Sequence, residues 1–455
     1  MERGCGFAMN PGSRILRRAG MQGLLRTKRM RAEFVTVSAM SSDPLVRPNI
    51  VVLGGGFGGL YTTLHLMNMP WSRLQKPRIT LVDRSDRFVF LPLLYDLLSG
   101  SVSTSEIAPY YVELLQNSDV RFQMGAITSL DPDAKTVQVD GKDEEYNIGF
   151  DRLVIATGAG PVLDSIPGAE DHAFAFYGLE DAFLVKERLR GLLSSELSSI
   201  KVVIIGAGFN GVELSSTIAD VLGERGCVTL LSRDDGILKD SKPHNRTTAE
   251  KSLRRLGVDV ETKASVDRIE EGTVFFKSES SEEESIQADL ILCTAGTRTS
   301  KFPGLSKLPQ NGRGQLQTTK TLQVKKSSGI FALGDIAAST DVSSATPSKA
   351  TAQTALQQAD YVAWNVYASI ADEPALAYRY LDLGEMMSLG DHDATISALD
   401  SINLSGKAAV AFRRAVYLAR MPTDLHRLRT TASFATRPFV SKANQSLTEL
   451  LRGIS

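Results

Sequence analysis

The chain has 455 residues, a formal net charge of −1, 42% hydrophobic and 23% charged side chains, so it is long enough for two or three domains with their own cores. The near-zero charge gives no reason to expect a nucleic-acid partner. No run of eighteen apolar residues occurs, which excludes a helix that spans a membrane.

The first 47 residues are rich in arginine and poor in acids. They contain eight Arg and one Lys against Glu2, Glu33 and Asp43, and no long apolar run. This composition is typical of an organelle transit peptide rather than of a secretory signal. We expect residues 1–47 to be such a peptide, with a disordered tail of no consequence as the alternative.

A glycine fingerprint follows the first apolar strand, in "NIVVLGGGFGGLYTTLHL". Gly54 permits the tight turn, Gly56 lets the backbone approach a pyrophosphate, and Gly59 lets the following helix pack closely on the strand. The next strand, "RITLVD", ends in Asp83, 24 residues beyond Gly59, where a carboxylate can bind ribose hydroxyls. The segment therefore predicts a dinucleotide site.

The same pattern returns after the strand 202–205, with Gly206, Gly208 and Gly211, so two dinucleotides are expected. The strand "CVTLLS" ends at Ser232 and Arg233, where an NADH site would usually carry an acid. A hydroxyl and a guanidinium suit a 2′-phosphate, which favours NADPH over NADH. Asp234 and Asp235 follow directly and leave NADH open.

Two further strands resemble those of flavoproteins with two dinucleotide-binding domains. "DRLVIATGA" ends in Thr157 and Gly158, and "GIFALGDIA" ends in Gly334 and Asp335. In those flavoproteins the aspartate binds the ribitol of FAD. A helix opened by Pro347–Ser348 would aim its N-terminus at the flavin pyrimidine.

That helix contains "AQTALQQA", in which Gln353 and Gln357 stand at i and i+4 on one face. The segment is similar to the AQxAxQ motif of type II NAD(P)H:quinone oxidoreductases, single-chain dehydrogenases that do not pump protons. "FVFLPLLYDLLSG" and "GVEL", with Glu213, resemble two other segments of that family. "LGEMMSLGDHDATIS" and "ARMPTDLHR" are most similar to the C-type enzymes of plant and algal chloroplasts.

The resemblance implies FAD, a hydride donor that is NADPH or NADH, and a membrane prenylquinone such as plastoquinone or demethylphylloquinone, with no metal. It implies that the FAD-binding residues are Gly54, Gly56, Phe57, Gly58, Gly59, Asp83, Arg84, Ile127, Thr157, Gly158, Asp335, Ala352 and Gln353. Those expected for NAD(P) are Gly206, Gly208, Asn210, Gly211, Glu213, Ser232, Arg233 and Gly296. Leu93, Tyr95, Gln353 and Gln357 are expected to contact the quinone. Glu213, Gln353 and Gln357 are the expected catalytic residues. Glu213 is expected to orient the nicotinamide and relay a proton, with a helix carboxylate bonded to backbone or ribose as the alternative, and the glutamines to donate to a quinone carbonyl.

The expected fold is α/β, with two Rossmann-like domains and a C-terminal membrane-associating α/β region. Residues 48–168 and 301–375 form the FAD-binding domain, 169–300 the NAD(P)H-binding domain, and 376–455 the C-terminal region. The acidic insert "SESSEEES", residues 278–285, is expected at an exposed hairpin tip.

The C-terminal region is strongly basic. Residues 407–442 contain eight basic residues and one acid, Asp424. Phe412, Ala415, Val416 and Ala419 form an apolar stripe, and Arg413 and Arg420 lie seven residues apart on another face of the same helix. Such a basic amphipathic helix can rest on an anionic membrane. Packing on its own domain or on a second copy in a homodimer is the alternative.

The three cysteines, Cys5, Cys227 and Cys293, form no redox pair, which argues against disulfide and sulfide:quinone reductases. We expect Cys227 and Cys293 to lie in the core. An antioxidant quinone reductase at a lipid surface and a flavoprotein that signals its nucleotide state remain alternatives. The expected location is the chloroplast, at the thylakoid or a plastoglobule surface, with the mitochondrion as the alternative.

Overall fold

The computed structural model describes residues 47–72, 75–279, 282–399 and 401–436. The expected transit peptide therefore lies outside the described residues, apart from Arg47.

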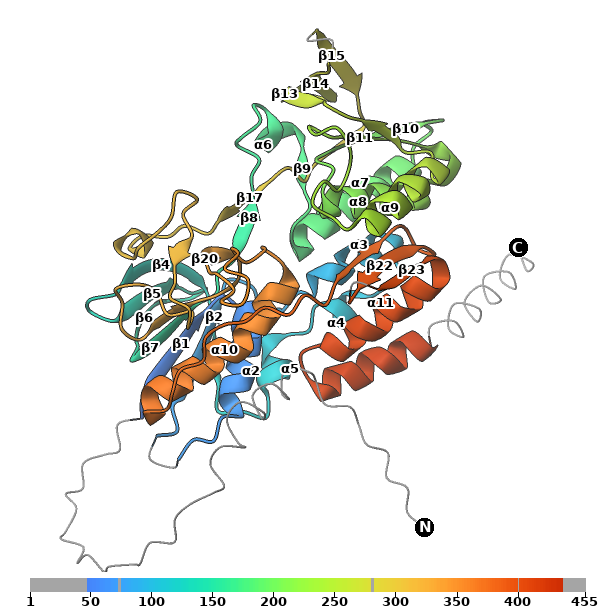
Figure 1. The fold of residues 1–455 in the computed structure, drawn as a ribbon. Coiled ribbons are helices and arrows are strands. Elements are labelled where there is room, and N and C mark those ends of the chain that lie inside the picture. The colour runs from blue at the N-terminus through green and yellow to red at the C-terminus, as the bar shows by residue number, and fades with distance from the viewer. Residues whose placement is uncertain (1–46, 73–74, 280–281, 400, 437–455) are drawn as a thin grey trace, which may run out of the picture.

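The first part of the molecule is built on a five-stranded parallel sheet in the order β19-β7-β1-β2-β3 (Figure 1). Its strands are β1 (Asn49–Leu53), β2 (Arg78–Asp83), β3 (Arg121–Met124), β7 (Arg152–Ile155) and β19 (Ile330–Ala332). Ile50 and Val52 point to the face covered by helices α2 (Phe57–Met67) and α10 (Ala352–Ala371). Val51 and Leu53 point to the other face, against an antiparallel sheet of β4 (Ala126–Asp131), β5 (Thr136–Asp140) and β6 (Glu145–Gly149). Alternate residues of one strand thus fill two cores.

The second part repeats this plan with a parallel sheet in the order β12-β11-β10-β16-β9. Its strands are β9 (Phe174–Ala175), β10 (Ile200–Ile205), β11 (Gly226–Leu231), β12 (Asp259–Glu261) and β16 (Leu290–Cys293). Its helices are α7 (Leu179–Leu193), α8 (Phe209–Leu222) and α9 (Pro243–Arg255). A sheet of β13 (Ser265–Glu270), β14 (Thr273–Lys277) and β15 (Glu283–Gln287) packs on it, and the expected acidic hairpin is confirmed as β14–β15.

The chain crosses between the two parts through an antiparallel pair of short strands, β8 (Ala159–Pro161) and β17 (Thr297–Thr299). The C-terminal part consists of the antiparallel strands β21 (Glu385–Ser388), β22 (Ala394–Ala398) and β23 (Ile402–Ser405), helix α11 (Gly406–Arg420) and a helical segment, 424–436. It lies beside α3 (Leu94–Ser99), α4 (Thr104–Ile107) and α8 (Figure 1).

The shorter elements are η1 (Leu91–Leu93), α5 (Tyr111–Leu115), α6 (Ala169–His172), η2 (Gly223–Arg225), η3 (Leu305–Lys307), β18 (Leu316–Gln317), η4 (Gly334–Ile336) and β20 (Ala337–Ala338).

Three local expectations were wrong. Helix α10 begins at Ala352, where the Thr351 side chain accepts a hydrogen bond from Thr354 N, and not at Pro347–Ser348. Cys227 is exposed, because it lies near the start of β11 beside the exposed Lys201 of β10. Arg413 is buried rather than presented to a membrane, because it pairs with a buried aspartate.

Within the described residues, no helix is both long and apolar enough to cross a membrane.

Candidate functional site

The first glycine fingerprint has the geometry of a pyrophosphate site. Gly54 has φ +92°, and a Cβ on Gly59 would collide with the Gly54 carbonyl oxygen. A Cβ on Gly56 would meet nothing within 4 Å, so the backbone is open on that side. Gly56 begins α2 without a side-chain cap, and the first turn has no acid. The amide groups of this turn are therefore available to a phosphate.

The neighbouring residues fit FAD. Asp83 ends β2 and accepts hydrogen bonds from Gly55 N at 2.5 Å and Ser85 N at 2.8 Å. Thr157, directly after β7, has a buried Oγ1 with no partner among the described residues. An orphaned hydroxyl at the C-terminal end of the sheet is expected where a dinucleotide supplies the partner. Burial raises the pKa of Asp335 in the same region.

The other residues expected at FAD lie around these. Gly58 packs on Leu333, and Phe57 is buried against Phe88 and Phe90 with 5.3 Å between ring centroids. Gly158 has φ +65°, Arg84 is exposed, and Ile127 and Ala352 are half-buried.

Two residues at this site escaped the sequence analysis. Gln358 is fully buried on α10; its Oε1 accepts from Gly334 N at 2.7 Å and its Nε2 donates to Ser339 Oγ at 2.7 Å. Gln358 thus fixes the Gly334–Asp335 turn. Burial raises the pKa of Tyr177 to about 12, and the ring lies within electrostatic reach of both Asp335 and Arg84. The only sequence signal for Gln358 was its place on the apolar side of α10.

The second fingerprint repeats the first. Gly206 has φ +105°, a Cβ on Gly211 would collide with the Gly206 carbonyl oxygen, and Gly208 begins α8 without a side-chain cap. Asn210 is exposed in the first turn of α8, and Gly296, with φ +87°, is exposed after β16. These residues form an open turn that fits a second pyrophosphate.

The residues expected to select the nucleotide have different environments. Ser232 is buried, and its Oγ donates to Gly236 O at 2.7 Å. Arg233 is exposed and has no hydrogen-bond or ion-pair partner among the described residues. Asp234 forms an ion pair with Lys239 at 3.2 Å. Arg233 is therefore free to meet a ribose phosphate, whereas Asp235, which is also exposed, keeps the NADH alternative open.

The two glutamines of α10 are both engaged with the segment after the helix. Gln353 Nε2 donates to the Tyr380 hydroxyl at 2.6 Å. Gln357 Nε2 donates to Leu381 O at 2.8 Å, and Leu381 N donates to Gln357 Oε1 at 2.9 Å. Both ends of the Gln357 amide are thus used by the backbone, whereas Tyr380 adds a hydroxyl that the sequence analysis missed.

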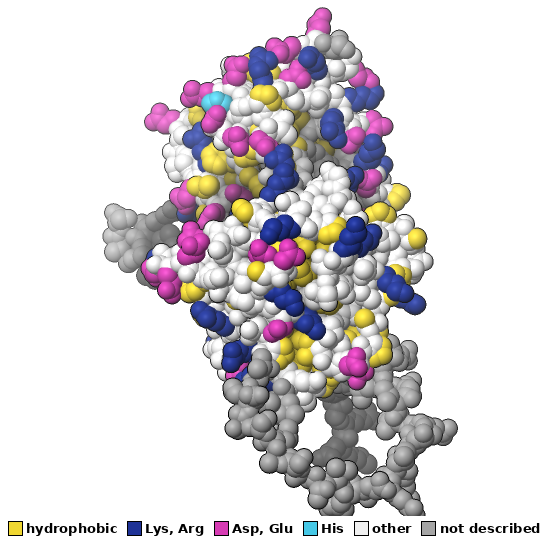
Figure 2. All heavy atoms as spheres, turned by 90° about the vertical axis from the view of Figure 1, so that its left-hand side faces the viewer, with side chains coloured by type: hydrophobic (Ala, Val, Ile, Leu, Met, Phe, Trp, Pro, Cys, Tyr) yellow, Lys and Arg dark blue, Asp and Glu magenta, His cyan; other side chains and the backbone are white. Residues whose placement is uncertain are grey.

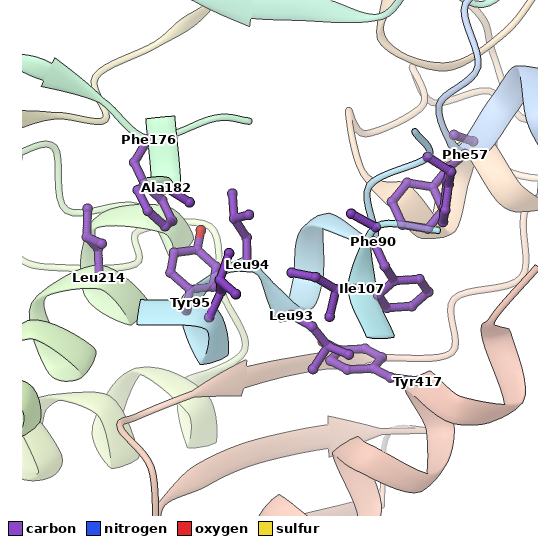
Figure 3. Close-up of a cluster of buried hydrophobic side chains, with 14 of the residues drawn as sticks. Phe57, Phe90, Leu93, Leu94, Tyr95, Ile107, Phe176, Ala182, Leu214 and Tyr417 are labelled. Carbon is purple, nitrogen blue, oxygen red and sulfur yellow. The ribbon is translucent and has the colours of Figure 1, made fainter. Parts of the chain in front are cut away.

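Leu93 and Tyr95 lie in the buried core between the parts (Figure 3). The Tyr95 ring lies beside Phe176, with centroids 5.3 Å apart, and Leu93 lies near Tyr417. Within the described part of the chain, neither Leu93 nor Tyr95 forms a hydrogen bond or ring contact with Gln353 or Gln357.

Glu213 occupies the junction of all three parts. It is buried on α8, and its Oε1 accepts from Ser388 N of β21 at 2.8 Å. Burial raises its pKa to about 7, Arg413 and the Ser388 amide oppose that rise, and Asp96 adds to it. A carboxyl group in this state can bind and release a proton near neutral pH.

The described residues contain no cluster of three or more His, Cys, Asp or Glu that could hold a metal ion. On the face shown in Figure 2, basic and acidic side chains of the described residues are interspersed, so this face has no extended field of one sign.

Comparison with known proteins shows which family has a sequence similar to this chain. Residues 48–359 match the family described as pyridine nucleotide-disulphide oxidoreductase. The chain is 42% identical over 395 residues to demethylphylloquinone reductase NdbB of Synechocystis sp., covering 86% of this chain and 96% of the relative. It is 39% identical over 440 residues to the alternative NAD(P)H-ubiquinone oxidoreductase C1, chloroplastic/mitochondrial, of Arabidopsis thaliana, covering 90% and 85%.

Solved structures support the fold. The structure of NDH2 from Plasmodium falciparum in complex with NADH superposes with a TM-score of 0.76 at 17% identity, covering 86% of this chain and 98% of that one. The sulfide:quinone oxidoreductase from Aquifex aeolicus gives 0.69 at 21% identity, covering 82% and 91%. The chain therefore belongs to the pyridine nucleotide-disulphide oxidoreductase family and, within it, to the type II NAD(P)H:quinone oxidoreductases.

Proposed function

We propose that this chain uses FAD to transfer two electrons from NADPH, in preference to NADH, to a prenylquinone at a plastid membrane, without pumping protons. The observation that carries the proposal is the pair of open glycine turns, Gly54–Gly59 and Gly206–Gly211, on two separate parallel sheets. The names of the two relatives support a quinone acceptor, and the name of the Arabidopsis thaliana relative supports a plastid or a mitochondrion. FAD, when bound, supplies the hydride-accepting and electron-donating chemistry.

The preference for NADPH rests on Arg233. Its guanidinium is exposed after β11, and Asp234 is paired with Lys239, so Asp235 is the exposed carboxylate that would support NADH instead. A guanidinium forms charge-assisted hydrogen bonds with a 2′-phosphate. It cannot accept a hydrogen bond from a 2′-hydroxyl, as a carboxylate would.

On the quinone side, Gln353 and Tyr380 provide the polar groups. Gln353 donates to the Tyr380 hydroxyl, which leaves the phenolic proton available to an acceptor. A quinone oxygen that gains charge is such an acceptor, and a positioned donor stabilises it. Gln357 holds the backbone of Leu381 next to this tyrosine and so keeps it in place.

The route to a lipid quinone is an exposed apolar surface on the C-terminal part, which we call the apolar face. It consists of Ala408, Ala411, Phe412, Ala415 and Ala419 of α11 and Leu425, Leu428 and Ala432 of segment 424–436. Phe412 is 43% exposed and Leu428 68%. Lys407 and Arg414 flank this face beside a groove of about 450 Å³. Exposed apolar groups bordered by cations fit the interfacial plane of an anionic membrane.

The proposal is tested by anaerobic rapid mixing with a quinone panel. NADPH should bleach the flavin absorbance. A plastoquinone or demethylphylloquinone analogue should then restore the absorbance faster than buffer without quinone does. A flavin that NADPH bleaches but no quinone reoxidises would favour the nucleotide-sensing alternative.

A further inference from the structure

The loop after β11, which carries Arg233, lies directly against the loop after β12. The two strands are parallel, and their last residues, Leu231 and Glu261, are register partners. Backbone hydrogen bonds then join the loops. Lys263 N donates to Asp234 O at 2.8 Å. Because ligands of such sheets bind at the carboxyl ends of the strands, both loops border the same site.

Lys263 and Arg233 hold equivalent places at this edge of the sheet. Each is the second residue after its strand, and each side chain is exposed. Lys263 also has φ +56°, in the left-handed region that residues other than glycine rarely adopt. The hydrogen bond from its amide to Asp234 O holds this backbone in place. A residue kept in such a conformation is a candidate for a functional role.

The ammonium group of Lys263 is held by a partner that a ligand can replace. It forms an ion pair with Glu279, in the turn of the acidic hairpin β14–β15, and the two side chains are 48% and 71% exposed. Such an exposed pair contributes little to stability, so its loss costs little. A phosphate carries a larger negative charge and three acceptor oxygens, and it therefore binds an ammonium group more strongly than a carboxylate does.

Asp235 is a second acid close to this lysine. Glu279 and, more weakly, Asp235 raise the pKa of Lys263, so the lysine stands between the acidic hairpin and the loop of Arg233. Lys263 thus offsets the one exposed carboxylate of that loop that would repel a 2′-phosphate.

We propose that Lys263 is a second residue that selects NADPH: when the nucleotide binds, its ammonium group leaves Glu279 and joins Arg233 in binding the 2′-phosphate. This inference rests on the proposed preference for NADPH. Glu279 then has a role as well, because it holds the lysine beside the site while no phosphate is bound. NADH offers no 2′-phosphate, so with NADH the ion pair stays intact and Lys263 adds nothing to binding.

The experiment measures the binding of two fragments to the FAD-loaded protein by titration calorimetry. Adenosine 2′,5′-bisphosphate and adenosine 5′-monophosphate differ by the 2′-phosphate, and neither carries a nicotinamide, so electron transfer does not enter the result. Lys263→Gln should lower the affinity for the bisphosphate about three- to tenfold and leave the monophosphate unaffected, because one exposed charge-assisted contact is lost. Lys263→Arg keeps the charge and should retain most of the affinity. All titrations use one low ionic strength, since salt screens the contact.

Glu279→Gln tests the exchange of partners. Removing the competing carboxylate should raise the affinity for the bisphosphate about two- to fivefold, and the gain should vanish when Lys263 is replaced by glutamine as well. An equal gain with and without the lysine would show a general effect of charge and overturn the exchange. Lys277→Gln is the matched control: it removes a cation from an exposed pair with Asp267, at 2.6 Å, on the same small sheet, and should change neither affinity.

The wild type separates a failure of this inference from a failure of the proposed function. If the wild type binds the bisphosphate no more tightly than the monophosphate, the preference for NADPH is wrong, and the role of Lys263 with it. If the wild type discriminates and Lys263→Gln discriminates equally well, the role of Lys263 alone is wrong.

Discussion

Three glutamines in one and a half turns of helix α10 have different roles, although the residue type is the same. Gln358, which faces the core, holds the Gly334–Asp335 turn, whereas Gln353 and Gln357 face Tyr380 and Leu381. A carboxamide has two donors and an oxygen acceptor, so its role depends on which partner the fold presents. The sequence motif identifies the correct turn of the helix, but it does not predict which partner each glutamine binds.

Gln353→Leu should slow flavin reoxidation by quinone and leave reduction by NADPH nearly unchanged. The substitution removes the hydrogen bond that orients the Tyr380 hydroxyl. Loss of one donor to the quinone oxygen that gains negative charge costs about 2–4 kcal/mol in the transition state.

Gln357→Leu should have a smaller kinetic effect and lower the free energy of unfolding by about 1 kcal/mol, because it frees both backbone groups of Leu381. Rapid mixing of each half-reaction separates the steps, and equal slowing of both would contradict the assignment.

Glu213→Gln should make stability less dependent on pH. The pKa of Glu213 is raised from 4.5 to about 7, so the folded chain binds this proton more tightly than the unfolded chain, and stability falls as pH rises through that window. Glutamine can still accept from Ser388 N and carries no charge to bury. The gain of the variant over the wild type should therefore grow between pH 5 and pH 8, by at most about 3 kcal/mol. Denaturant titrations at both pH values measure it; a constant difference would show that Glu213 is already ionised at low pH.

Arg233→Gln should lower kcat/KM for NADPH about ten- to hundredfold and leave NADH nearly unaffected. Ser232 is a poorer target than the sequence suggested, because it is buried and bonded to Gly236 O. A charge-assisted bond contributes about 1.5–3 kcal/mol, which gives this ratio. Both nucleotides are measured at one ionic strength, since salt screens the phosphate contact. Arg254→Gln, an exposed arginine on α9, is the matched control; a parallel loss with both nucleotides would place the ribose elsewhere.

At the scale of elements, helix α11 has two opposite faces with different tasks. One face, with Arg413 and Tyr417, is buried against α3 and η1, and the other includes the exposed Phe412. The hydrophobic period of the sequence showed that the helix is amphipathic, but it assigned Arg413 to the outer surface. The partner of Arg413 lies 317 residues earlier in the chain, so no local pattern could reveal the pair.

Phe412→Asp combined with Leu428→Asp should reduce sedimentation with anionic liposomes while FAD content stays as in the wild type. Both side chains are exposed on the apolar face, so the changes place charges where the proposed lipid contact lies without opening the core. Phe183→Asp with Leu184→Asp, two exposed apolar residues of α7, is the matched control and should sediment normally. Undiminished sedimentation of the first variant would locate the lipid contact on another surface.

For the molecule as a whole, the sequence predicted both parallel sheets and both glycine turns, because strand, glycine and helix signals lie within some twenty residues of one another. It did not predict how the parts join. Tyr417 packs on Phe90 with centroids 5.5 Å apart, His426 hydrogen-bonds to Glu106 O at 2.8 Å, and the Tyr61 hydroxyl donates to Arg420 O. These contacts link residues about 300 or more positions apart, which periodicity cannot detect.

One buried cluster contains apolar residues of all three parts, including Leu60, Ile204 and Met421. Deletion of residues 407–455 should therefore lower the melting temperature and the FAD content, and not merely release the protein from membranes. It would leave Asp96 buried without its arginine and remove the packing of Tyr417 on Phe90, and an uncompensated buried charge alone costs about 3–5 kcal/mol. A chain that ends at residue 436 keeps every described contact and serves as the control. Gel filtration followed by flavin absorbance and a thermal melt measures both quantities. Normal FAD content and an unchanged melting temperature in the longer deletion would show that α11 and segment 424–436 do not stabilise the rest of the molecule.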